Sequence, residues 1–380
     1  WNRGVVLLGP RQCGKTTLAR LIASQTESTY FDLEDPTDLA RLTDPMLTLQ
    51  SLRGLVILDE IQRRPQWMPA LRVLLDRTPQ PARFLLLGSA SPDIIRGTSE
   101  SLAGRIAYVD MAGFNLHEID EEPMRTLWLR GGFPLSFTAT TERRSVQWRN
   151  DFLRTFIERD LPGYGHRPAP EILRRFFSMV AHYHGQTWNG SEIARSLQVS
   201  HPTTRHYSDL LKGAFLLRQL PPWFENAGKR IVKSPKVYIR DSGLLHALLN
   251  IDTFSALEGH PKMGASWEGF ALENLMSVLD ERQAYFWATQ SGAELDLFLL
   301  HGAKRLGVEF KYTSAPSITR SMHIAMTDLK LDDLYVVHPG TGEFPLAAHI
   351  TAIGLRELMT QFVDQDRGSH GDRKSVPLSS

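Results

Sequence analysis

Short apolar runs alternate with segments of helical spacing near the N-terminus. Gly4 to Leu8 is an apolar run that leads into a glycine-containing loop, and Thr17 to Ala23 continues with the spacing of a helix. Residues 55–58 and 84–87 are two more continuous apolar runs, a pattern typical of parallel strands that are buried on both faces. The start of the chain is therefore predicted to be an α/β unit built on a parallel sheet.

From about residue 110 the pattern changes to amphipathic helices. Gly131-Gly132-Phe133-Pro134 and Pro162-Gly163-Tyr164-Gly165 interrupt them, because Gly and Pro clusters favour turns. This change places the end of the first domain near residue 125.

A helix-turn-helix pattern follows between residues 191 and 217. Ser191 is predicted to cap a helix through Leu197, and a second helix is predicted from about Pro202, a residue that suits a first helical turn, to Leu211. The apolar positions that we expect to join the two helices are Ile193, Ala194, Leu197, Val199, Leu210 and Leu211. The positions that we expect to face outward are Thr203, Thr204, Arg205, His206 and Ser208. Residues 215–220 have the pattern of a strand, so we interpret the region as a winged helix.

The last part of the chain has the pattern of a third α/β unit. A helix is predicted over residues 267–279, with strands near residues 284–288, 294–300 and 306–311. The final stretch is polar and rich in Ser and Gly, which is typical of disorder. The predicted domains are the parallel-sheet unit over 1–125, a helical region with the winged helix over 126–232, the third α/β unit over 233–363 and a disordered tail over 364–380.

Charge is distributed unevenly along the chain. The formal net charge is only +1, but residues 142–240 contain 17 Lys or Arg and 8 Asp or Glu, a net of +9 that leaves −8 elsewhere. A basic segment of this kind suits contact with nucleic acid, and a solvated Arg-rich surface is the alternative. No apolar run is long enough to span a bilayer, so a cytoplasmic protein without membrane contact is expected. Because the chain begins at Trp1, a short leading segment is expected to be missing.

The first chemical motif lies between the first strand and the first helix. Gly9 to Thr16 has the phosphate-loop spacing of a glycine, four residues and then Gly-Lys-Thr. In such a loop the backbone amides and the helix N-terminus hold phosphate, Lys15 reaches the β- and γ-phosphates, and Thr16 ligates Mg²⁺. The predicted ATP-binding residues are Gly9, Pro10, Arg11, Gln12, Cys13, Gly14, Lys15, Thr16 and Thr17.

A second motif completes the predicted ATP site. The apolar run at residues 55–58 leads into Asp59 and Glu60. Asp59 is predicted to hold Mg²⁺ and Glu60 to act as the general base that polarises the attacking water. Ser89, in the turn after the next strand, is the predicted sensor of the γ-phosphate, and an ordinary turn is the alternative.

Acidic and basic residues also follow the strand period in the third unit. Glu294 and Asp296 share one face of a strand, as do Glu309 and Lys311 on the next strand. With Glu268 on the preceding helix, Asp296 and Glu309 could hold a divalent metal while Lys311 activates water against a phosphodiester. This order of residues resembles the PD-(D/E)xK nuclease fold. A nuclease-like scaffold used only for binding or assembly is the alternative.

Several motifs together resemble a known family. They are GPRQCGKTTLA, LDEIQ, GSAS, SLAGR, GGFP and KSPKVYIRDSGL, and they cover nearly the whole chain. These motifs are similar to those of a widespread group of bacterial and archaeal AAA-type ATPases. The resemblance implies ATP and Mg²⁺ as cofactors. It also implies that Arg105 acts as an arginine finger across a subunit interface, with a surface salt bridge as the alternative, and hence a homo-oligomer, for which a hexamer is one arrangement.

These patterns favour an ATP-hydrolysing AAA-type ATPase that acts on DNA through its winged helix and nuclease-like unit. A second hypothesis is a nucleotide-switched regulatory ATPase whose later domains bind protein and do not cleave DNA. A nucleotide kinase would share the phosphate loop, but Asp59, Glu60 and the large C-terminal region argue against it.

Overall fold

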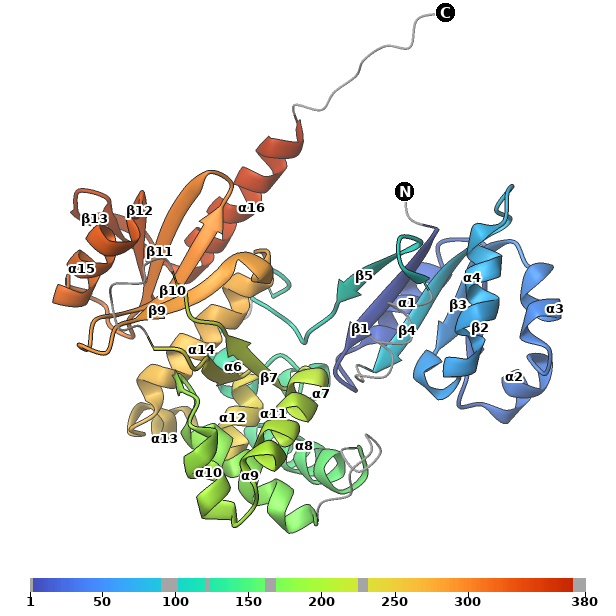
Figure 1. The fold of residues 1–380 in the computed structure, drawn as a ribbon, viewed down its shortest axis with the longest axis horizontal. Coiled ribbons are helices and arrows are strands. Elements are labelled where there is room, and N and C mark those ends of the chain that lie inside the picture. The colour runs from blue at the N-terminus through green and yellow to red at the C-terminus, as the bar shows by residue number, and fades with distance from the viewer. Residues whose placement is uncertain (1–2, 90–101, 120–122, 161–168, 225–231, 372–380) are drawn as a thin grey trace, which may run out of the picture. The chain divides into compact units, whose positions relative to one another are not determined.

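The computed structural model describes residues 3–89, 102–119, 123–160, 169–224 and 232–371. The chain divides into two compact units (Figure 1). The first unit contains Trp1–Phe114, Gly132–Arg174 and Gln198–Leu217. The second contains Asn115–Gly131, Arg175–Leu197 and Arg218–Ser380. The two units therefore divide the chain differently from the three predicted segments, because the polypeptide passes more than once between them.

The first unit is built on a five-stranded parallel sheet in the order β2-β3-β4-β1-β5. The strands are β1 (Gly4–Gly9), β2 (Ser28–Asp32), β3 (Gly54–Asp59), β4 (Ala82–Ser89) and β5 (Ile106–Asp110). Both faces of β1 are buried, since Val6 and Leu8 join one apolar cluster and Leu7 joins another. The prediction of a parallel sheet from continuous apolar runs is confirmed.

The first unit also contains helices. They are α1 (Lys15–Ala23), α2 (Pro36–Arg41), α3 (Pro45–Gln50) and α4 (Met68–Asp76), with short 3₁₀ turns at Ile61–Arg63 and Pro65–Trp67. Later parts of the chain add α7 (Pro134–Phe137), α8 (Glu142–Thr155), a π-helical turn at Phe156–Asp160 and α11 (His201–Gly213). Helix α9 (Pro170–His182) begins in the first unit and ends in the second.

The second unit is built on a six-stranded mixed sheet in the order β13-β14-β12-β11-β10-β9. The strands are β9 (Ala284–Ala288), β10 (Glu294–His301), β11 (Lys304–Phe310), β12 (Asp333–His338), β13 (Glu343–Ala347) and β14 (Ile350–Gly354). Strands β10 and β11 form an antiparallel hairpin through a two-residue turn, with His301 paired to Lys304. The predicted hairpin between residues 300 and 306 is confirmed.

The second unit also contains helices (Figure 1). They are α6 (Met124–Arg130), α10 (Gly190–Leu197), α12 (Ser242–Leu248), α13 (Phe254–Glu258), α14 (Met263–Met276), a 3₁₀ turn at Glu281–Gln283, α15 (Arg320–Leu329) and α16 (Leu355–Gly371). Helix α15 packs on β10, β11 and β12, whereas α14 contacts β11 and α16. Trp128 of α6 and Trp267 of α14 are fully buried and meet edge to face, with ring centroids 5.5 Å apart.

A small three-stranded sheet in the order β6-β8-β7 joins β6 (Gln186–Thr187), β8 (Lys236–Ile239) and β7 (Leu217–Leu220). Strand β7 confirms most of the predicted strand at 215–220. Strand β8 is a short buried strand, and Lys236 on β8 pairs with Thr187 on β6.

The two helices of the predicted helix-turn-helix are present as α10 and α11. Two details of the prediction are wrong. Asn189 caps α10 in place of Ser191, because its side-chain oxygen accepts from the Glu192 amide at 3.2 Å. Thr204 and Ser208 are buried, not outward, since they lie on the same face of α11 as the apolar residues. Helix α10 belongs to the second unit and α11 to the first.

Helix α16 runs to Gly371, so residues 364–371 are helical although we predicted a disordered tail from residue 364. Burial of Leu358, Met359 and Phe362 anchors the N-terminal turns of this helix, and its polar end continues the same backbone hydrogen bonding. Residues 372–380, the break at 162–165 and residues 90–91 of the GSAS motif lie outside the described part of the chain. Among the described helices, none is both long enough and apolar enough to cross a bilayer.

Candidate functional site

The phosphate loop connects the end of β1 to the start of α1. Two of its glycines are required by geometry: Gly14 has φ of +108°, and a Cβ on Gly9 would lie 2.1 Å from the backbone oxygen of Met111. Gly14 thus permits the left-handed turn that opens the helix, and Gly9 permits the close approach of the segment after β5. The structure therefore has the phosphate loop at the residues for which the sequence motif predicts it.

Lys15 is the first residue of α1, and its side chain is almost completely buried. Its Nζ donates to the carbonyl oxygens of Gly9 at 3.0 Å and Pro10 at 2.7 Å. The ammonium therefore lies within the loop whose amides would hold the phosphates. Cys13 is also buried, and burial raises the pKa of its thiol, so Cys13 serves as a small packing residue.

Asp59 ends β3 and accepts hydrogen bonds from two hydroxyl groups. Its Oδ2 accepts from the Thr16 hydroxyl at 2.7 Å and from the Tyr30 hydroxyl at 2.6 Å. Mg²⁺ in nucleotide sites binds through one or two protein oxygens while it keeps several waters. The Thr16 hydroxyl and the Asp59 carboxylate, held side by side at the phosphate loop, fit that ion.

Glu60 follows Asp59 in the left-handed conformation, with φ of +58°. Its amide donates to Asp59 Oδ1 at 2.9 Å, and Gln62 donates from Nε2 to Glu60 Oε2. Burial, and next the charge of Asp59, raise the pKa of Glu60, while Arg11 and Lys15 act in the opposite direction. A raised pKa makes a carboxylate a stronger base, which suits proton abstraction from water.

The two remaining predicted residues of the ATP site are placed differently. Ser89 is the last residue of β4 and pairs in register with Gly9, so its backbone lies beside the phosphate loop; its side chain is outside the described part of the chain. Arg105 forms a bidentate ion pair with Asp76, through Nε at 2.7 Å and Nη2 at 2.9 Å. Arg105 thus forms a salt bridge within its own chain, which is the alternative that we gave to an arginine finger.

The acidic residues predicted for the second unit also converge. Asp296 on β10 and Glu309 on β11 are almost buried, and the Asp296 amide donates to Glu309 Oε2 at 3.4 Å. The Phe310 amide donates to Asp296 Oδ2 at 3.1 Å, and Lys311 Nζ donates to Glu309 Oε1 at 3.0 Å. Glu294 is exposed, and a register shift between Leu295 and Phe298 interrupts the alternation of β10, but its charge is one of those that raise the pKa of Lys236 on β8 (Lys236–Ile239).

Glu268 on α14 reaches this group through two residues of β8 that the sequence motifs did not single out as chemical. Lys236 Nζ donates to Glu268 Oε1 at 3.2 Å and to Asp296 Oδ1 at 3.1 Å. The Tyr238 hydroxyl donates to the same Glu268 oxygen at 2.6 Å. We call Lys236, Tyr238, Glu268, Asp296, Glu309 and Lys311 the carboxylate cluster.

The predicted metal site in this cluster does not fit the geometry. Within the described ranges, no three His, Cys, Asp or Glu side chains are arranged to hold a metal ion. The physical reason is that the Lys236 ammonium, which is itself a cation, lies between Glu268 and Asp296. The three predicted ligands, Glu268, Asp296 and Glu309, thus belong to one cluster with the predicted water-activating Lys311, and the Lys236 ammonium lies between two of the acids.

Burial dominates the protonation of the cluster. Burial, and next the charge of Asp296, raise the pKa of Glu268 to about 7 and that of Glu309 to about 8. Burial acts to lower the pKa of Lys236, but Tyr238, Glu268 and Asp296 outweigh it and raise that pKa well above its ordinary value. The lysines therefore stay charged at neutral pH while the glutamates share protons.

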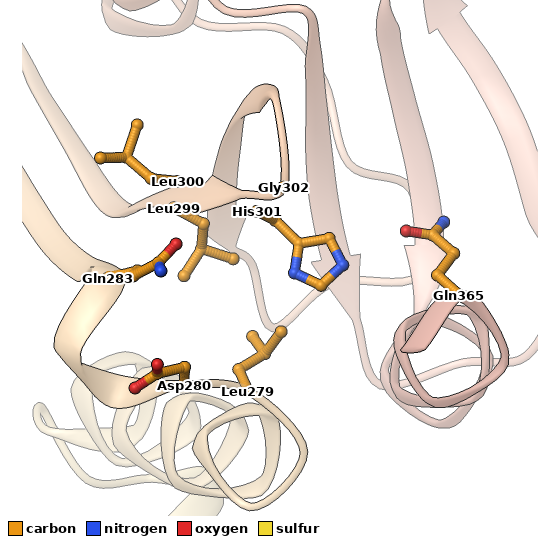
Figure 2. Close-up of a pocket in the computed structure, with 8 residues that line it drawn as sticks. All are labelled: Leu279, Asp280, Gln283, Leu299, Leu300, His301, Gly302 and Gln365. Atoms are coloured by element: carbon orange, nitrogen blue, oxygen red, sulfur yellow. The ribbon is translucent and has the colours of Figure 1, made fainter. Parts of the chain in front are cut away.

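A separate cavity of about 280 Å³ lies at the turn of the β10–β11 hairpin. Figure 2 shows its wall, which comes from Leu279, Asp280 and Gln283, from hairpin residues 299–302 and from Gln365 of α16. Asp280 in this wall is bonded to Arg282, which lowers the pKa of Asp280. None of the predicted site residues lines this cavity.

Comparison with known proteins gives three consecutive matches along the chain. Residues 2–120 match the family described as AAA domain. Residues 121–255 match the domain of unknown function DUF8612, and residues 263–358 match the domain of unknown function DUF4143. The uncharacterized proteins Mb2031c of Mycobacterium bovis and Rv2008c of Mycobacterium tuberculosis are each 50% identical over 356 residues, which is 94% of this chain and 81% of each relative. The chain belongs to the AAA-type ATPase family.

A chain of the solved structure of Drosophila ORC bound to DNA aligns with 80% of this AAA-type ATPase and 87% of its own length. The identity is 12% and the TM-score is 0.25. A TM-score of this size supports no conclusion about the site.

Three contributors to the sites of the AAA-type ATPase were missed by sequence reasoning. Tyr30 lies on β2, beside β3, and nothing in its local pattern marks it. Lys236 and Tyr238 had a usable signal, since residues two apart on a strand share one face and both precede the Arg-Asp of the KSPKVYIRDSGL motif. What the pattern could not show is which acids that face would meet.

Proposed function

We propose that this AAA-type ATPase hydrolyses ATP with Mg²⁺ at the phosphate loop and uses the cycle to change its contacts with DNA. The observation that carries the proposal is the 2.7 Å hydrogen bond between Thr16 and Asp59, with Glu60 adjacent and Lys15 buried in the loop. Lys15 and the loop amides hold the phosphates, Thr16 and Asp59 hold Mg²⁺, and Glu60 accepts a proton from the attacking water.

Two substitutions separate these roles. Lys15→Ala removes the cation that faces the phosphates, so binding of labelled ATP is expected to be lost. Glu60→Gln keeps the shape of the side chain and removes the base, so binding is expected to persist while turnover stops. Equal loss of ATP binding in both variants would refute the role of Glu60.

The basic segment at residues 142–240 supports the DNA part of the proposal. Its helix α11 exposes Arg205 on a surface that also carries Lys212 in its last turn. Side chains of this type contact phosphates and bind without strong sequence preference. The proposed winged helix would use α11 in this way.

Salt dependence tests this contact. Affinity for duplex DNA is expected to fall steeply between low and moderate salt, because neutralised phosphates release counterions. Arg205→Ala and Lys212→Ala should each reduce the slope of log affinity against log salt by about 1. Lys304→Ala, which removes an exposed lysine outside the basic segment, is the matched control and should leave the slope unchanged. An affinity that does not change with salt would rule out the electrostatic contact.

A second candidate function is a nucleotide-switched regulatory ATPase without DNA cleavage. The observation that favours it is the position of Lys236, whose ammonium lies between Glu268 and Asp296. The second unit would then keep a nuclease-like arrangement for binding or assembly. ATPase rates measured with duplex, single-stranded and branched DNA distinguish the two, because stimulation by DNA is expected only for the first.

A further inference from the structure

Lys236 and the two carboxylates that it binds come from three separate elements. Lys236 comes from β8 in the small sheet, Glu268 from α14, and Asp296 from β10 in the large sheet. The side chain of Lys236 is only 5% exposed, and its Nζ is almost equidistant from the two carboxylates, at 3.2 Å and 3.1 Å. Since neither acid can face water freely, the lysine is their main source of positive charge.

The position of Lys236 is determined by the backbone and by packing. Its residue pairs with Thr187 across β6 and β8, and its Nζ lies 5.9 Å from the centroid of the Phe286 ring. Tyr238, two residues along the same strand, donates to the Glu268 oxygen that Lys236 also binds. Two donors from one strand thus converge on one carboxylate.

A divalent ion and this ammonium cannot share the same oxygens. A bound Mg²⁺ or Mn²⁺ lies about 2.0–2.3 Å from each carboxylate oxygen. The space between Glu268 Oε1 and Asp296 Oδ1 already contains Nζ, so a metal there would meet a second cation at close range in a buried site. The net charge of the carboxylate cluster, with its three acids and two lysines, is also zero once the acids together hold a single proton.

We infer that Lys236 is the resident cation of the carboxylate cluster, and that the second unit takes up no divalent metal while Lys236 is in place. The inference concerns the second unit alone and stands or falls independently of ATP hydrolysis by the first unit. With Lys236 in place the carboxylate cluster is a closed polar cluster, and without Lys236 it is open to a metal ion.

Manganese binding by the full chain tests the inference. All proteins carry Asp59→Asn, which removes the metal ligand of the ATP site, and free Mn²⁺ is followed by electron paramagnetic resonance without nucleotide. The parent is expected to bind no Mn²⁺ at millimolar concentration. Lys236→Met, similar in length but uncharged, is expected to bind one Mn²⁺ ion at least about tenfold more tightly than the parent does. Lys236→Arg keeps the positive charge and is expected to behave like the parent.

Adding Asp296→Asn to Lys236→Met should remove the acquired binding, which assigns the ion to the cluster. Removal of Lys236 leaves two buried acids unpaired, so thermal unfolding with and without Mn²⁺ is measured for every protein. If Lys236→Met does not fold, the parent still tests the inference, because Mn²⁺ is then expected to leave the unfolding temperature of the parent unchanged. The inference is overturned if the parent binds Mn²⁺ and loses it on Asp296→Asn, or if a folded Lys236→Met binds none.

Discussion

At the scale of single residues, Tyr30 shows how the ATP site depends on a side chain outside its motifs. Its hydroxyl donates to Asp59 Oδ2 at 2.6 Å, on the same oxygen that Thr16 uses. A hydrogen bond to a charged group contributes about 1.5–3 kcal/mol. We expect Tyr30→Phe to lower kcat/KM for Mg-ATP by about tenfold or more, because Asp59 loses a donor that orients it.

Steady-state ATPase kinetics check this expectation. Tyr285→Phe is the control, since it removes a tyrosine hydroxyl that is bonded only to the backbone oxygen of Arg282 in the second unit. Tyr30→Phe with unchanged kcat/KM would show that the hydrogen bonds from Thr16 and from the Glu60 amide suffice to orient Asp59.

The glutamates of the carboxylate cluster give a pH-dependent prediction. The pKa of Glu309 is raised to about 8 and that of Glu268 to about 7, whereas unfolded glutamates ionise near their ordinary value of 4.5. Protonated glutamates therefore stabilise the folded state at low pH, and this contribution is lost as pH rises through the folded pKa values. Between about pH 5 and 8, the free energy of unfolding is expected to fall by up to about 1.4 kcal/mol per pH unit for each group.

Denaturant unfolding of the parent and of Glu309→Gln over this pH range checks the sign. The amide cannot ionise, so the variant should show a shallower decline. Burial and next the charge of Asp296 raise the pKa of Glu309, whereas Lys311 acts to lower it; the pKa of Lys311 is itself raised, so this lysine remains charged throughout the range. A parent whose stability rises from pH 5 to pH 8 would contradict the assignment of raised glutamate pKa values.

At the scale of elements, the contact between α6 and α12 explains two glycines of the family motifs. A Cβ on Gly243 would lie 2.1 Å from the carbonyl oxygen of Arg130, and a Cβ on Gly131 would lie 2.2 Å from Asp241 Oδ1. Asp241 also caps α12 by accepting from the Leu244 amide at 2.8 Å. Gly131, the first residue of the GGFP motif, therefore meets the RDSGL motif in the second unit as one helix-packing contact.

This contact predicts opposite effects for two glycines at the second position of a helix. Gly243→Ala in α12 forces backbone apart, so the free energy of unfolding is expected to fall by about 1–3 kcal/mol. Gly264→Ala in α14 meets no atom within 4 Å and should be neutral or stabilising by up to about 1 kcal/mol. Urea unfolding of both variants measures the difference, and equal effects would mean that α6 and α12 are not in this close contact.

At the scale of the whole molecule, the role of Arg105 bears on whether the AAA-type ATPase works as an oligomer. The resemblance to the family implies an arginine finger across a subunit interface, whereas the structure pairs Arg105 with Asp76 of the same chain. If Arg105 serves a neighbouring ATP site, Arg105→Ala should slow hydrolysis by about 10³-fold and leave ATP affinity nearly intact.

Asp76→Ala separates the two roles. It breaks the same ion pair but leaves the guanidinium available, so a finger predicts near-normal turnover in Asp76→Ala and self-association of the parent with ATP in analytical ultracentrifugation. Equal, small effects of Arg105→Ala and Asp76→Ala on turnover, with a monomer at every concentration, would reduce Arg105 to a surface salt bridge.

The chemistry carried by short sequence spacings was predictable. The phosphate loop, Asp59 with Glu60, and the β10–β11 hairpin each depend on residues a few positions apart, and backbone geometry turns such spacing into proximity. Continuous apolar runs likewise predicted β1, β3 and β4, because a strand buried on both faces leaves no room for polar alternation. The prediction for α11 was weaker, since Thr204 and Ser208 are polar residues that packing nevertheless buries.

Only the tertiary structure decided which distant side chains complete each site. Tyr30 reaches Asp59 across 29 positions, and Lys236 reaches Asp296 across 60. Sequence periodicity determined the face of the strand on which Lys236 lies, but the carboxylates it meets depend on how β8, α14 and β10 pack. The sequence by itself thus determined the acids and the hairpin that brings Asp296 beside Glu309. Packing placed the Lys236 ammonium between Glu268 and Asp296, where a metal ion was expected. A buried charge is retained at such a position because opposite charges surround it.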